Sequence, residues 1–206
     1  MKTLLPGILA MGILVVASNI LVQFPIGQWL TWGAFTYPLT FLVSELVNRF
    51  HGVVAARRVV LAGFGTGLIC SLIGTQIIGE FGPLVTLRVA LASGLAFLVS
   101  QMLDVNIFDK LRRSAWWRAP FLSGLIASSI DTAIFFTIAF SAMFIWVEPG
   151  NDVSWATASV PLLGFGAMVP LWASLAFADW GVKVLVDVLA LMPFRIAIAK
   201  FAANAV

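Results

Sequence analysis

The sequence contains little charge. Only 10% of its 206 residues are Asp, Glu, Lys or Arg, whereas 61% are hydrophobic, and the mean hydropathy is +1.05. A soluble domain carries about 25% charged residues, so this chain has too few polar side chains to cover a surface that faces water. The composition therefore predicts an integral membrane protein and excludes a soluble globular domain.

The sequence also has little cysteine and histidine, with one of each. Cys70 lies in an apolar run and has no second cysteine to pair with, and His51 is isolated, so we expect no disulfide and no metal site. No nucleophile–base pair and no phosphate-binding glycine loop is present, so we expect neither an enzyme nor a bound cofactor. The small net charge of +3 gives no indication of a nucleic-acid partner.

What the sequence has instead is a series of long apolar runs, which predict an all-α protein that forms a single domain over residues 1–206. Residues 4–24 resemble a signal peptide, but the run is long enough to cross a hydrocarbon core of about 30 Å. We therefore count it as the first of six transmembrane helices. The predicted helices cover residues 4–24, 32–48, 59–79, 84–103, 120–147 and 170–192.

Basic residues occupy every second connection. The N-terminus, the links after the second and fourth helices, and the C-terminal tail carry Lys2; Arg49, Arg57, Arg58; Lys110, Arg112, Arg113, Arg118; and Arg195, Lys200. The other links carry only the acids Glu80, Glu148 and Asp152. Because cytoplasmic loops are rich in Lys and Arg, the pattern predicts both termini on the cytoplasmic side.

The segment before the last helix is unusual, because prolines and glycines interrupt it over residues 161–169. A straight helix over residues 161–192 would be about 48 Å long, against a core of about 30 Å. We expect either a broken or re-entrant segment at the outer face, or one long, tilted and kinked helix.

Two apolar motifs recur at nearly the same spacing. The sequence FLVSELVN at residues 41–48 returns as FLVSQMLD at 97–104, and GLICSLIGT at 67–75 returns as GLIASSIDT at 124–132. The pattern predicts a duplicated helix pair, with the second and third helices parallel to the fourth and fifth. Transporter folds often contain such repeats and bind substrate between the copies.

Charged residues inside the predicted helices are the candidates for function, because each costs about 2.5–3.5 kcal/mol near the bilayer centre. Asp131 lies near mid-membrane, where it faces a cavity or forms an ion pair with Arg88 or Lys183. Arg88 lies near the outer boundary, where it either extends outward to the interface or neutralises an acid. Asp179, Lys183 and Asp187 form one stripe in which the lysine can bridge either acid, either for ion coupling or as a self-satisfied structural pair.

The repeated motif supplies polar residues near the inner end of two helices. Glu45 with Asn48 in one copy corresponds to Gln101 with Asp104 in the other. Two copies of this spacing indicate a paired functional feature at the inner mouth, although a structural role in holding the cytoplasmic loops explains them equally well.

A ridge of small residues, Gly63, Gly67, Ser71 and Thr75, follows one face of the third predicted helix. Such ridges allow close helix approach. The ridge would suit helix packing within the chain, and it would suit contact between two copies of the chain in a homodimer equally well.

FLVSELVNRFHG at residues 41–52, followed by Ala56 and Arg57, is the first of several blocks that resemble the queuosine precursor transporters. That family belongs to the wider vitamin uptake transporter group. Further blocks that resemble the family are Arg88-Val89-Ala90 with Ala92, Ser93, Ala96 and Phe97; Ser100-Gln101 with Asp104; Trp117-Arg118 with Asp131-Thr132; and Lys183 followed by Pro193. The resemblance covers about residues 30–195, and it departs from the family at Arg49 and Glu45, where we would expect an acid and an aspartate.

This resemblance implies a multi-pass protein of the bacterial cytoplasmic (inner) membrane that takes up 7-cyano-7-deazaguanine, 7-aminomethyl-7-deazaguanine or both. A guanine-like edge offers adjacent N–H donors that a carboxylate can accept, and Asp131 is best placed for that role. Phe135, one turn further along, could stack on the flat ring, and Gln101 and Asn48 could bind its carbonyl. Glu45, Arg88 and Lys183 complete the expected substrate site, and Asp179, Lys183, Asp187 and Asp104 are the candidates for ion pairing or coupling.

Other functions remain open at this stage. Relatives of this group include substrate-binding membrane subunits that need a separate ATP-driven module. Those subunits present an Ala-x-x-x-Ala face on the first helix, but here Ala10 is followed by Leu14 and Ala17 by Leu21. A membrane enzyme or a purely structural bundle is the third possibility. The energy source for uptake, proton coupling or facilitated entry, is not evident from the sequence.

Overall fold

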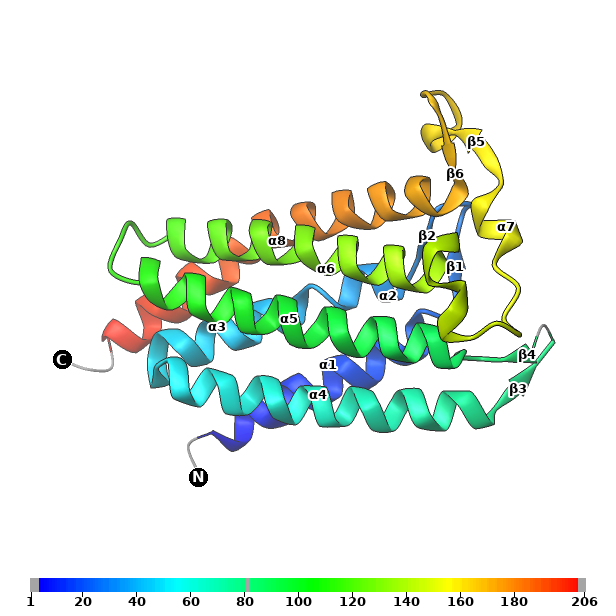
Figure 1. Cartoon of the computed structure of the whole chain (residues 1–206). Helices are drawn as coiled ribbons and strands as arrows, with labels where there is room; N and C mark the ends of the chain where they lie inside the picture. The colour runs from blue at the N-terminus through cyan, green and yellow to red at the C-terminus, as the bar shows by residue number, and fades with distance from the viewer. Residues whose placement is uncertain (1–3, 81, 204–206) are drawn as a thin grey trace.

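A computed structural model describes residues 4–80 and 82–203. Lys2 and Phe81, on which two of the expected connections depend, lie outside these residues. The described chain forms a bundle of antiparallel and parallel helices, with short strands and turns gathered at one end (Figure 1). The helices are α1 (Leu5–Leu21), α2 (Gly33–Thr36), α3 (Leu39–His51), α4 (Val53–Gln76), α5 (Leu87–Leu111), α6 (Arg118–Phe140), α7 (Ser154–Thr157) and α8 (Leu171–Ala203), with 3-10 turns η1 (Ala142–Val147) and η2 (Leu162–Gly164).

The bundle is apolar outside and polar inside. Side chains such as Ile69, Leu72 and Leu189 are more than 60% exposed, while Asn48 and Arg88 are fully buried. This distribution is the reverse of that in a soluble protein and suits a lipid environment. Among the described helices, α4, α5 and α6 are long and apolar enough to cross a membrane, and α1 is a shorter apolar helix. The chain is therefore a largely helical, multi-pass membrane protein.

The predicted second helix, residues 32–48, is not continuous. It divides into α2 and α3, with Tyr37 and Pro38 between them. Proline has no backbone N–H and cannot continue the ladder of helical hydrogen bonds. The chain instead makes short-range bonds, in which the N–H groups of Thr40 and Phe41 donate to the carbonyls of Tyr37 and Pro38. The break places Tyr37 next to the polar interior.

Other helix boundaries also differ from those expected. A single residue, Gly52 with φ of 85°, separates α3 from α4, so Arg57 and Arg58 lie within α4 and not in a link. Helix α5 continues to Leu111, whereas α6 ends at Phe140 and gives way to η1. Pro193 lies inside α8 without ending it. Hydropathy marks the apolar stretch of a helix, whereas its polar ends extend beyond that stretch.

Residues 161–169 form a broken segment, which was one of the two expected alternatives. Strands β5 (Ser159–Pro161) and β6 (Met168–Pro170) pair as an antiparallel hairpin whose tip contains η2. The tip turns at Leu163 and Gly164, which have φ values of 53° and 90°. The kinked-helix alternative is therefore wrong, and the segment is broken as a hairpin before α8 begins.

Two further hairpins lie at the same end of the bundle: β1 (Pro25–Ile26) with β2 (Leu30–Thr31), and β3 (Ile78–Gly79) with β4 (Gly82–Pro83). Figure 1 shows the α3–α4 and α5–α6 connections at the opposite end, together with the start of α1 and the end of α8. The bundle thus has a hairpin end, where no Lys or Arg occurs in residues 22–32, 77–86 or 141–170, and a basic end, which carries the arginines and lysines of the connections.

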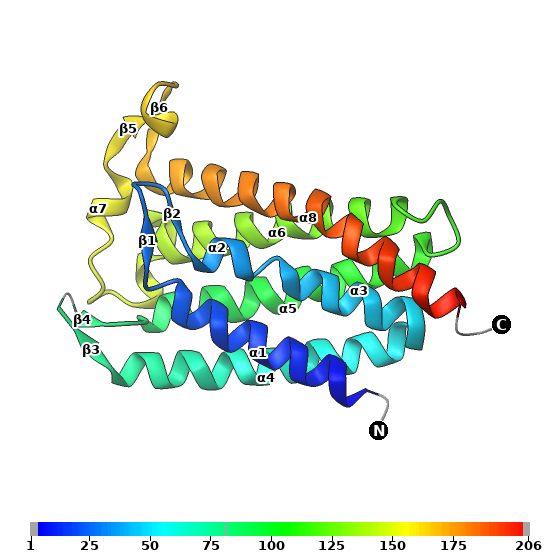
Figure 2. The same cartoon turned by 180° about the vertical axis from the view of Figure 1, so that it is seen from behind.

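Helices α1 and α4 pack closely through the small-residue ridge. A Cβ atom on Gly63 would lie 2.5 Å from Cγ of Met11 and 3.1 Å from the ring of Phe97, and one on Gly67 would lie 3.5 Å from Val15. These contacts join α1, α4 and α5 in the largest apolar core, around Met11, Val59 and Val60. Figure 2 shows α1 lying across α4 on this side of the molecule. The ridge therefore serves packing within the chain.

Candidate functional site

Helices α3, α5, α6 and α8 enclose most of the buried polar side chains. These side chains lie at three levels. Arg88 is near the hairpin end; a set that we call the central network consists of Tyr37, Ser100, Asp131, Thr132, Asp179 and Lys183; and a set nearer the basic end, the carboxylate triad, consists of Glu45, Asp104 and Asp187. The expected substrate residues are therefore divided between levels.

The Asp131 carboxylate is the centre of the central network. Its Oδ1 atom accepts hydrogen bonds from the Tyr37 hydroxyl at 2.8 Å and the Ser100 hydroxyl at 3.1 Å. Its Oδ2 atom accepts from Nζ of Lys183 at 2.7 Å. Asp131 therefore forms an ion pair with Lys183, one of the two partners considered from the sequence, and does not pair with Arg88.

Lys183 is shared between two carboxylates. Its Nζ atom lies 2.7 Å from Oδ2 of Asp131 and 2.5 Å from Oδ2 of Asp179, which is four residues earlier on α8. It also donates to the Thr132 hydroxyl at 3.0 Å, and that hydroxyl donates to Asp179 at 3.0 Å. Two acids and one ammonium group give the network a net negative charge when all three are ionised. The stripe along α8 thus bridges to α6 and does not satisfy itself alone.

Tyr37 is a member of this network that the sequence analysis missed. Besides its bond to Asp131, its ring faces Nζ of Lys183, with 5.3 Å between Nζ and the ring centroid. This distance is typical of a cation–π contact. The available signal was that the chain's one tyrosine directly precedes Pro38 inside an apolar segment.

Gln101 adjoins the central network through Thr40. Its Nε2 atom donates to the Thr40 hydroxyl at 2.8 Å, and that hydroxyl donates to the backbone carbonyl of Tyr37 at 2.7 Å. Gln101 is fully buried, yet its Oε1 atom has no hydrogen-bond partner. A buried acceptor without a donor is rare in proteins, so this oxygen is available to a ligand or to water.

The carboxylate triad lies one helical turn further toward the basic end. Ser44 donates to Oδ2 of Asp104 at 3.1 Å, and Ser123 donates to Oε1 of Glu45 at 3.4 Å. Asp104 repels both Glu45 and Asp187 electrostatically. Within the described residues, no ion pair involves a triad carboxylate.

Asn48 links the triad to α5. Its Nδ2 atom donates to the carbonyl of Val105 at 2.8 Å, which places the amide beside the residue that follows Asp104. Its Oδ1 atom is buried without a partner. The two copies of the repeated motif therefore occupy different surroundings, because Gln101 joins the central network and Glu45 joins the triad.

Arg88 serves the end of another helix. Its Nε atom donates to the carbonyl of Ile138 at 2.6 Å, and its Nη2 atom donates to the carbonyl of Ser141. The last carbonyls of a helix lack partners within the helix and attract cations, so Arg88 stabilises the end of α6. It is fully buried, which contradicts the outward extension expected from the sequence, and it makes no salt bridge among the described residues. The nearby acid is Glu148, whose Oε2 atom accepts a hydrogen bond from the backbone N–H of Arg88 at 2.9 Å and whose charge attracts the guanidinium.

Arg88 and Phe135 were expected in the substrate site, but Arg88 lies away from Asp131 and Phe135 packs among other aromatic rings. Along α5, Arg88 is about 18 Å from Ser100, which marks the level of Asp131. Phe135 is half-buried and packs edge-on against Phe136 and Phe140, with 5.1 Å and 5.9 Å between ring centroids. The aromatic ring that contacts Asp131 is that of Tyr37.

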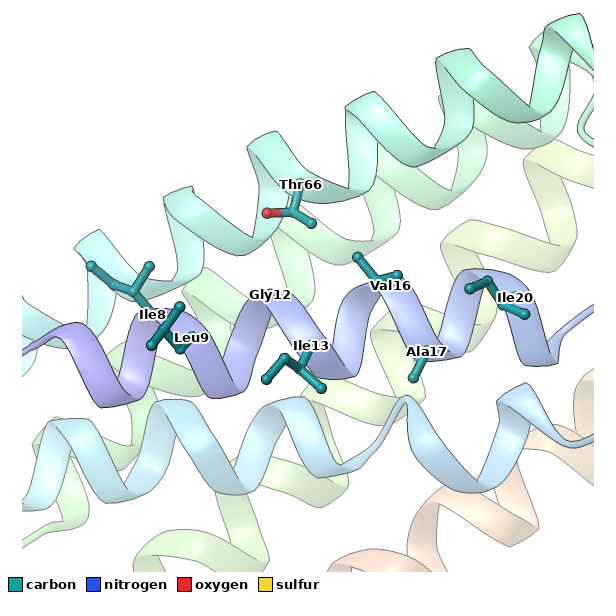
Figure 3. A pocket seen from close by; sticks show the side chains of 8 residues that line it. All are labelled: Ile8, Leu9, Gly12, Ile13, Val16, Ala17, Ile20 and Thr66. Carbon is teal, nitrogen blue, oxygen red and sulfur yellow. The ribbon is translucent and has the colours of Figure 1, made fainter.

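An apolar groove lies apart from these residues, between α1 and α4. Ile8, Ile13, Val16 and Thr66 are among its lining residues (Figure 3). None of the expected site residues lines it. It belongs to the apolar outer surface and not to the polar interior.

Comparison with known proteins gives consistent matches over most of the chain. The family model described as "Putative vitamin uptake transporter" matches residues 31–198. The queuosine precursor transporter of Escherichia coli is 33% identical over 196 residues, which cover 88% of this chain and 79% of that protein. A probable queuosine precursor transporter of Haemophilus influenzae is 29% identical and covers 87% of this chain and 79% of its own length.

A more distant match is a probable queuosine precursor transporter of Bacillus subtilis, 29% identical over 59% of this chain and 62% of that protein. No solved structure shows significant similarity to the chain. The family match covers all the buried polar residues described above, from Tyr37 to Asp187. The chain therefore belongs to the vitamin uptake transporter family, as the resemblance in its sequence predicted.

Proposed function

We propose that this protein takes up queuosine precursors, 7-cyano-7-deazaguanine and 7-aminomethyl-7-deazaguanine, across the bacterial cytoplasmic membrane. The names of its relatives support the substrate class. The observation that carries the proposal is the buried carboxylate of Asp131, which Lys183, Tyr37 and Ser100 hold by hydrogen bonds. Gln101 adjoins this network through Thr40, and its Oε1 atom has no hydrogen-bond partner.

The chemistry of the ligand suits this site. A guanine-like edge presents a ring N–H and an exocyclic amino group side by side, and a ring carbonyl next to them. A carboxylate accepts both donors, and an ammonium or amide N–H group donates to the carbonyl. Asp131 takes the first role, and Lys183 or Gln101 takes the second. The ring of Tyr37, whose centroid lies 5.3 Å from Nζ of Lys183, offers a flat surface for the ligand, and Phe135 follows Asp131 by one turn of α6.

The pairing of Lys183 allows Asp131 to exchange partners. Asp179 holds Nζ of Lys183 at 2.5 Å, so the ammonium group keeps a counterion when Asp131 turns to the ligand. A buried charge that loses its only partner destabilises a protein by about 3–5 kcal/mol. Sharing one lysine between two acids avoids that loss during binding.

The proposed topology has six membrane-spanning segments with both termini in the cytoplasm. In addition to α4, α5 and α6, these are α1, the broken pair α2–α3, and α8. The arginines and lysines at the basic end support this orientation, since positive charge accumulates on the cytoplasmic side. Hydrogen bonds join Thr40 to Gln101, Ser44 to Asp104 and Asn48 to Val105, so the contacts advance in the same direction along α3 and α5, which supports a parallel repeat.

The test is ligand binding and counterflow with the purified protein in liposomes. A panel of the two deazaguanines, guanine and adenine should show saturable binding of the deazaguanines and rejection of adenine, which lacks the adjacent pair of N–H donors. Asp131→Asn should weaken binding by about 1.5–3 kcal/mol, or roughly 10- to 150-fold, the range for hydrogen bonds to a charged group.

The matched control is Asp152→Asn, which changes an acid in the connection after η1 to its amide. It should bind the deazaguanines as the wild type does. If Asp131→Asn binds as tightly as this control, Asp131 does not contact the substrate. Transport without added ATPase subunits supports a self-sufficient transporter, whereas transport that needs such subunits favours the ATP-driven alternative.

A further inference from the structure

The carboxylate triad is a buried acidic site that the binding of a guanine-like edge does not require. Glu45 on α3, Asp104 on α5 and Asp187 on α8 are 5%, 0% and 8% exposed. Each projects from a different helix, and Asp104 interacts electrostatically with the other two. Three negative charges brought together in a medium of low polarity repel one another strongly, so they cannot all be ionised.

Among the described residues, no cation forms an ion pair with a carboxylate of the triad. Lys183, which belongs to the central network, precedes Asp187 by one turn of α8 and attracts its carboxylate. Its ammonium group, however, already pairs with Asp131 and Asp179. On the other side, Arg49 and Arg112 each donate to the other's backbone carbonyl. Arg118 begins α6, and its guanidinium lies over the ring of Trp117.

The triad also lacks hydrogen-bond donors. Ser44 and Ser123 each provide one hydroxyl, and Ser128 lies beside Asp187. Three buried acceptor atoms nevertheless have no partner: Oδ1 of Asp104, Oδ2 of Asp187 and Oδ1 of Asn48. The Asn48 oxygen is an independent sign, because a neutral amide has no charge to balance and only needs a donor.

One proton reduces both deficits. On a carboxylate oxygen it removes one negative charge and converts that oxygen from an acceptor into a donor for a neighbouring acceptor. A metal ion suits the site less well, because no group of three acidic, histidine or cysteine side chains in the described residues is arranged to hold one. Gly124 on α6 leaves room for the Asp187 carboxyl group, because a Cβ atom at that position would lie 3.1 Å from the carboxyl carbon.

We propose that the triad of Glu45, Asp104 and Asp187 binds one exchangeable proton, which enters the cell together with the substrate. This inference depends on the proposed uptake function and adds its driving force. The proton binds to the triad when the site faces outward and leaves to the cytoplasm when the site opens at the basic end. The triad is suited to this role because it lies between the central network and that end.

The experiment uses the purified full chain in liposomes with an entrapped pH-sensitive dye and 7-cyano-7-deazaguanine as substrate. Addition of the substrate should acidify the lumen. An inward-directed gradient of one pH unit should raise substrate accumulation about tenfold if one proton accompanies each molecule, since one unit corresponds to about 1.4 kcal/mol.

Asp104→Asn and Asp187→Asn should abolish the dye signal and the gradient-driven accumulation while equilibrium binding and counterflow exchange persist. Asparagine resembles the protonated acid in shape and hydrogen bonding, but it cannot release a proton. The matched control is again Asp152→Asn, which should acidify the lumen as the wild type does. Thermal unfolding in detergent shows which variants are folded, and the wild-type dye signal tests the proposal without any variant.

The possible results distinguish the two proposals. If the wild type binds and transports the substrate but uptake ignores the pH gradient or follows a sodium gradient, the proton site is wrong and the transport function stands. If both variants acidify the lumen as the control does, the proton is carried elsewhere and the triad has no such role. If the wild type neither binds nor transports a deazaguanine, the proposed function itself fails.

Discussion

At the scale of single residues, Lys183 is the group on which the electrostatic balance of the interior depends. It is the one cation that forms ion pairs with buried acids among the described residues, and it serves Asp131 and Asp179 together. Its ammonium group also faces the ring of Tyr37. Removing it leaves the Asp131 and Asp179 carboxylates without a counterion, although hydroxyl groups still donate to them.

Lys183→Met should therefore destabilise the protein by about 3–5 kcal/mol, the range for a buried pair that loses one partner. The measurement is thermal or denaturant unfolding in detergent. Lys110→Met, which removes an exposed lysine at the end of α5, is the control and should change stability little. Adding Asp179→Asn to Lys183→Met should recover part of the stability, since only one acid then lacks a counterion. Equal stability of Lys183→Met and Lys110→Met would contradict this account.

The sequence predicted most of these polar residues, because charge in an apolar helix is conspicuous and costly. It named Lys183 and Arg88 as possible partners of Asp131 but could not choose between them. Asp131 and Lys183 are far apart along the chain, and only the packing of α6 against α8 brings them to 2.7 Å. For Arg88 the sequence left outward extension and an acid partner open for the same reason, and neither alternative included the carbonyls of Ile138 and Ser141. Every residue has a backbone carbonyl, so the residue types do not show which carbonyls will accept hydrogen bonds from an arginine.

At the scale of elements, the contact between α1 and α2 depends on a glycine. A Cβ atom on Gly33 would lie 2.9 Å from the backbone nitrogen of Val22 and 3.0 Å from the carbonyl oxygen of Ser18. These are backbone atoms and cannot rotate away. This contact holds α2, and with it the adjacent Tyr37, against the end of α1.

Gly33→Ala should lower the free energy of unfolding by about 1–3 kcal/mol, the usual effect of overpacking. Gly65→Ala is the matched control, because no atom lies within 4 Å of a Cβ atom at that position of α4. Alanine is the better helix former there, so the control should be neutral or slightly stabilising. Unfolding curves in detergent compare the two. A Gly33→Ala protein as stable as Gly65→Ala would show that α2 shifts without strain.

Hydropathy located the long helices well but not the broken one. Residues 32–43 are mostly apolar, and a proline within such a run does not show by itself whether the helix bends or ends. Pro193 and Pro38 illustrate the two results: α8 continues through the first, and the second separates α2 from α3. The hairpin of β5 and β6 was likewise hidden, because its prolines and glycines are compatible with several broken structures.

At the scale of the whole molecule, the uneven charge of the two ends makes the proposed orientation testable. Cys70 is the chain's one cysteine, so Cys70→Ser gives a background without thiols. Single cysteines introduced as Glu80→Cys near the hairpin end and Arg113→Cys near the basic end then report each side. A membrane-impermeant maleimide should label the first in intact spheroplasts and the second only after permeabilisation. The opposite labelling pattern would reverse the proposed direction.

The position of Tyr37 has a practical consequence for spectroscopy. Because the chain contains one tyrosine, isotope labelling of tyrosine alone would yield the magnetic-resonance signal of one residue in the whole protein. That signal would originate from the hydroxyl that donates to Asp131 and the ring that faces Lys183. Titration with a ligand would then be observed at the centre of the bundle, without a dye, a tag or an engineered probe.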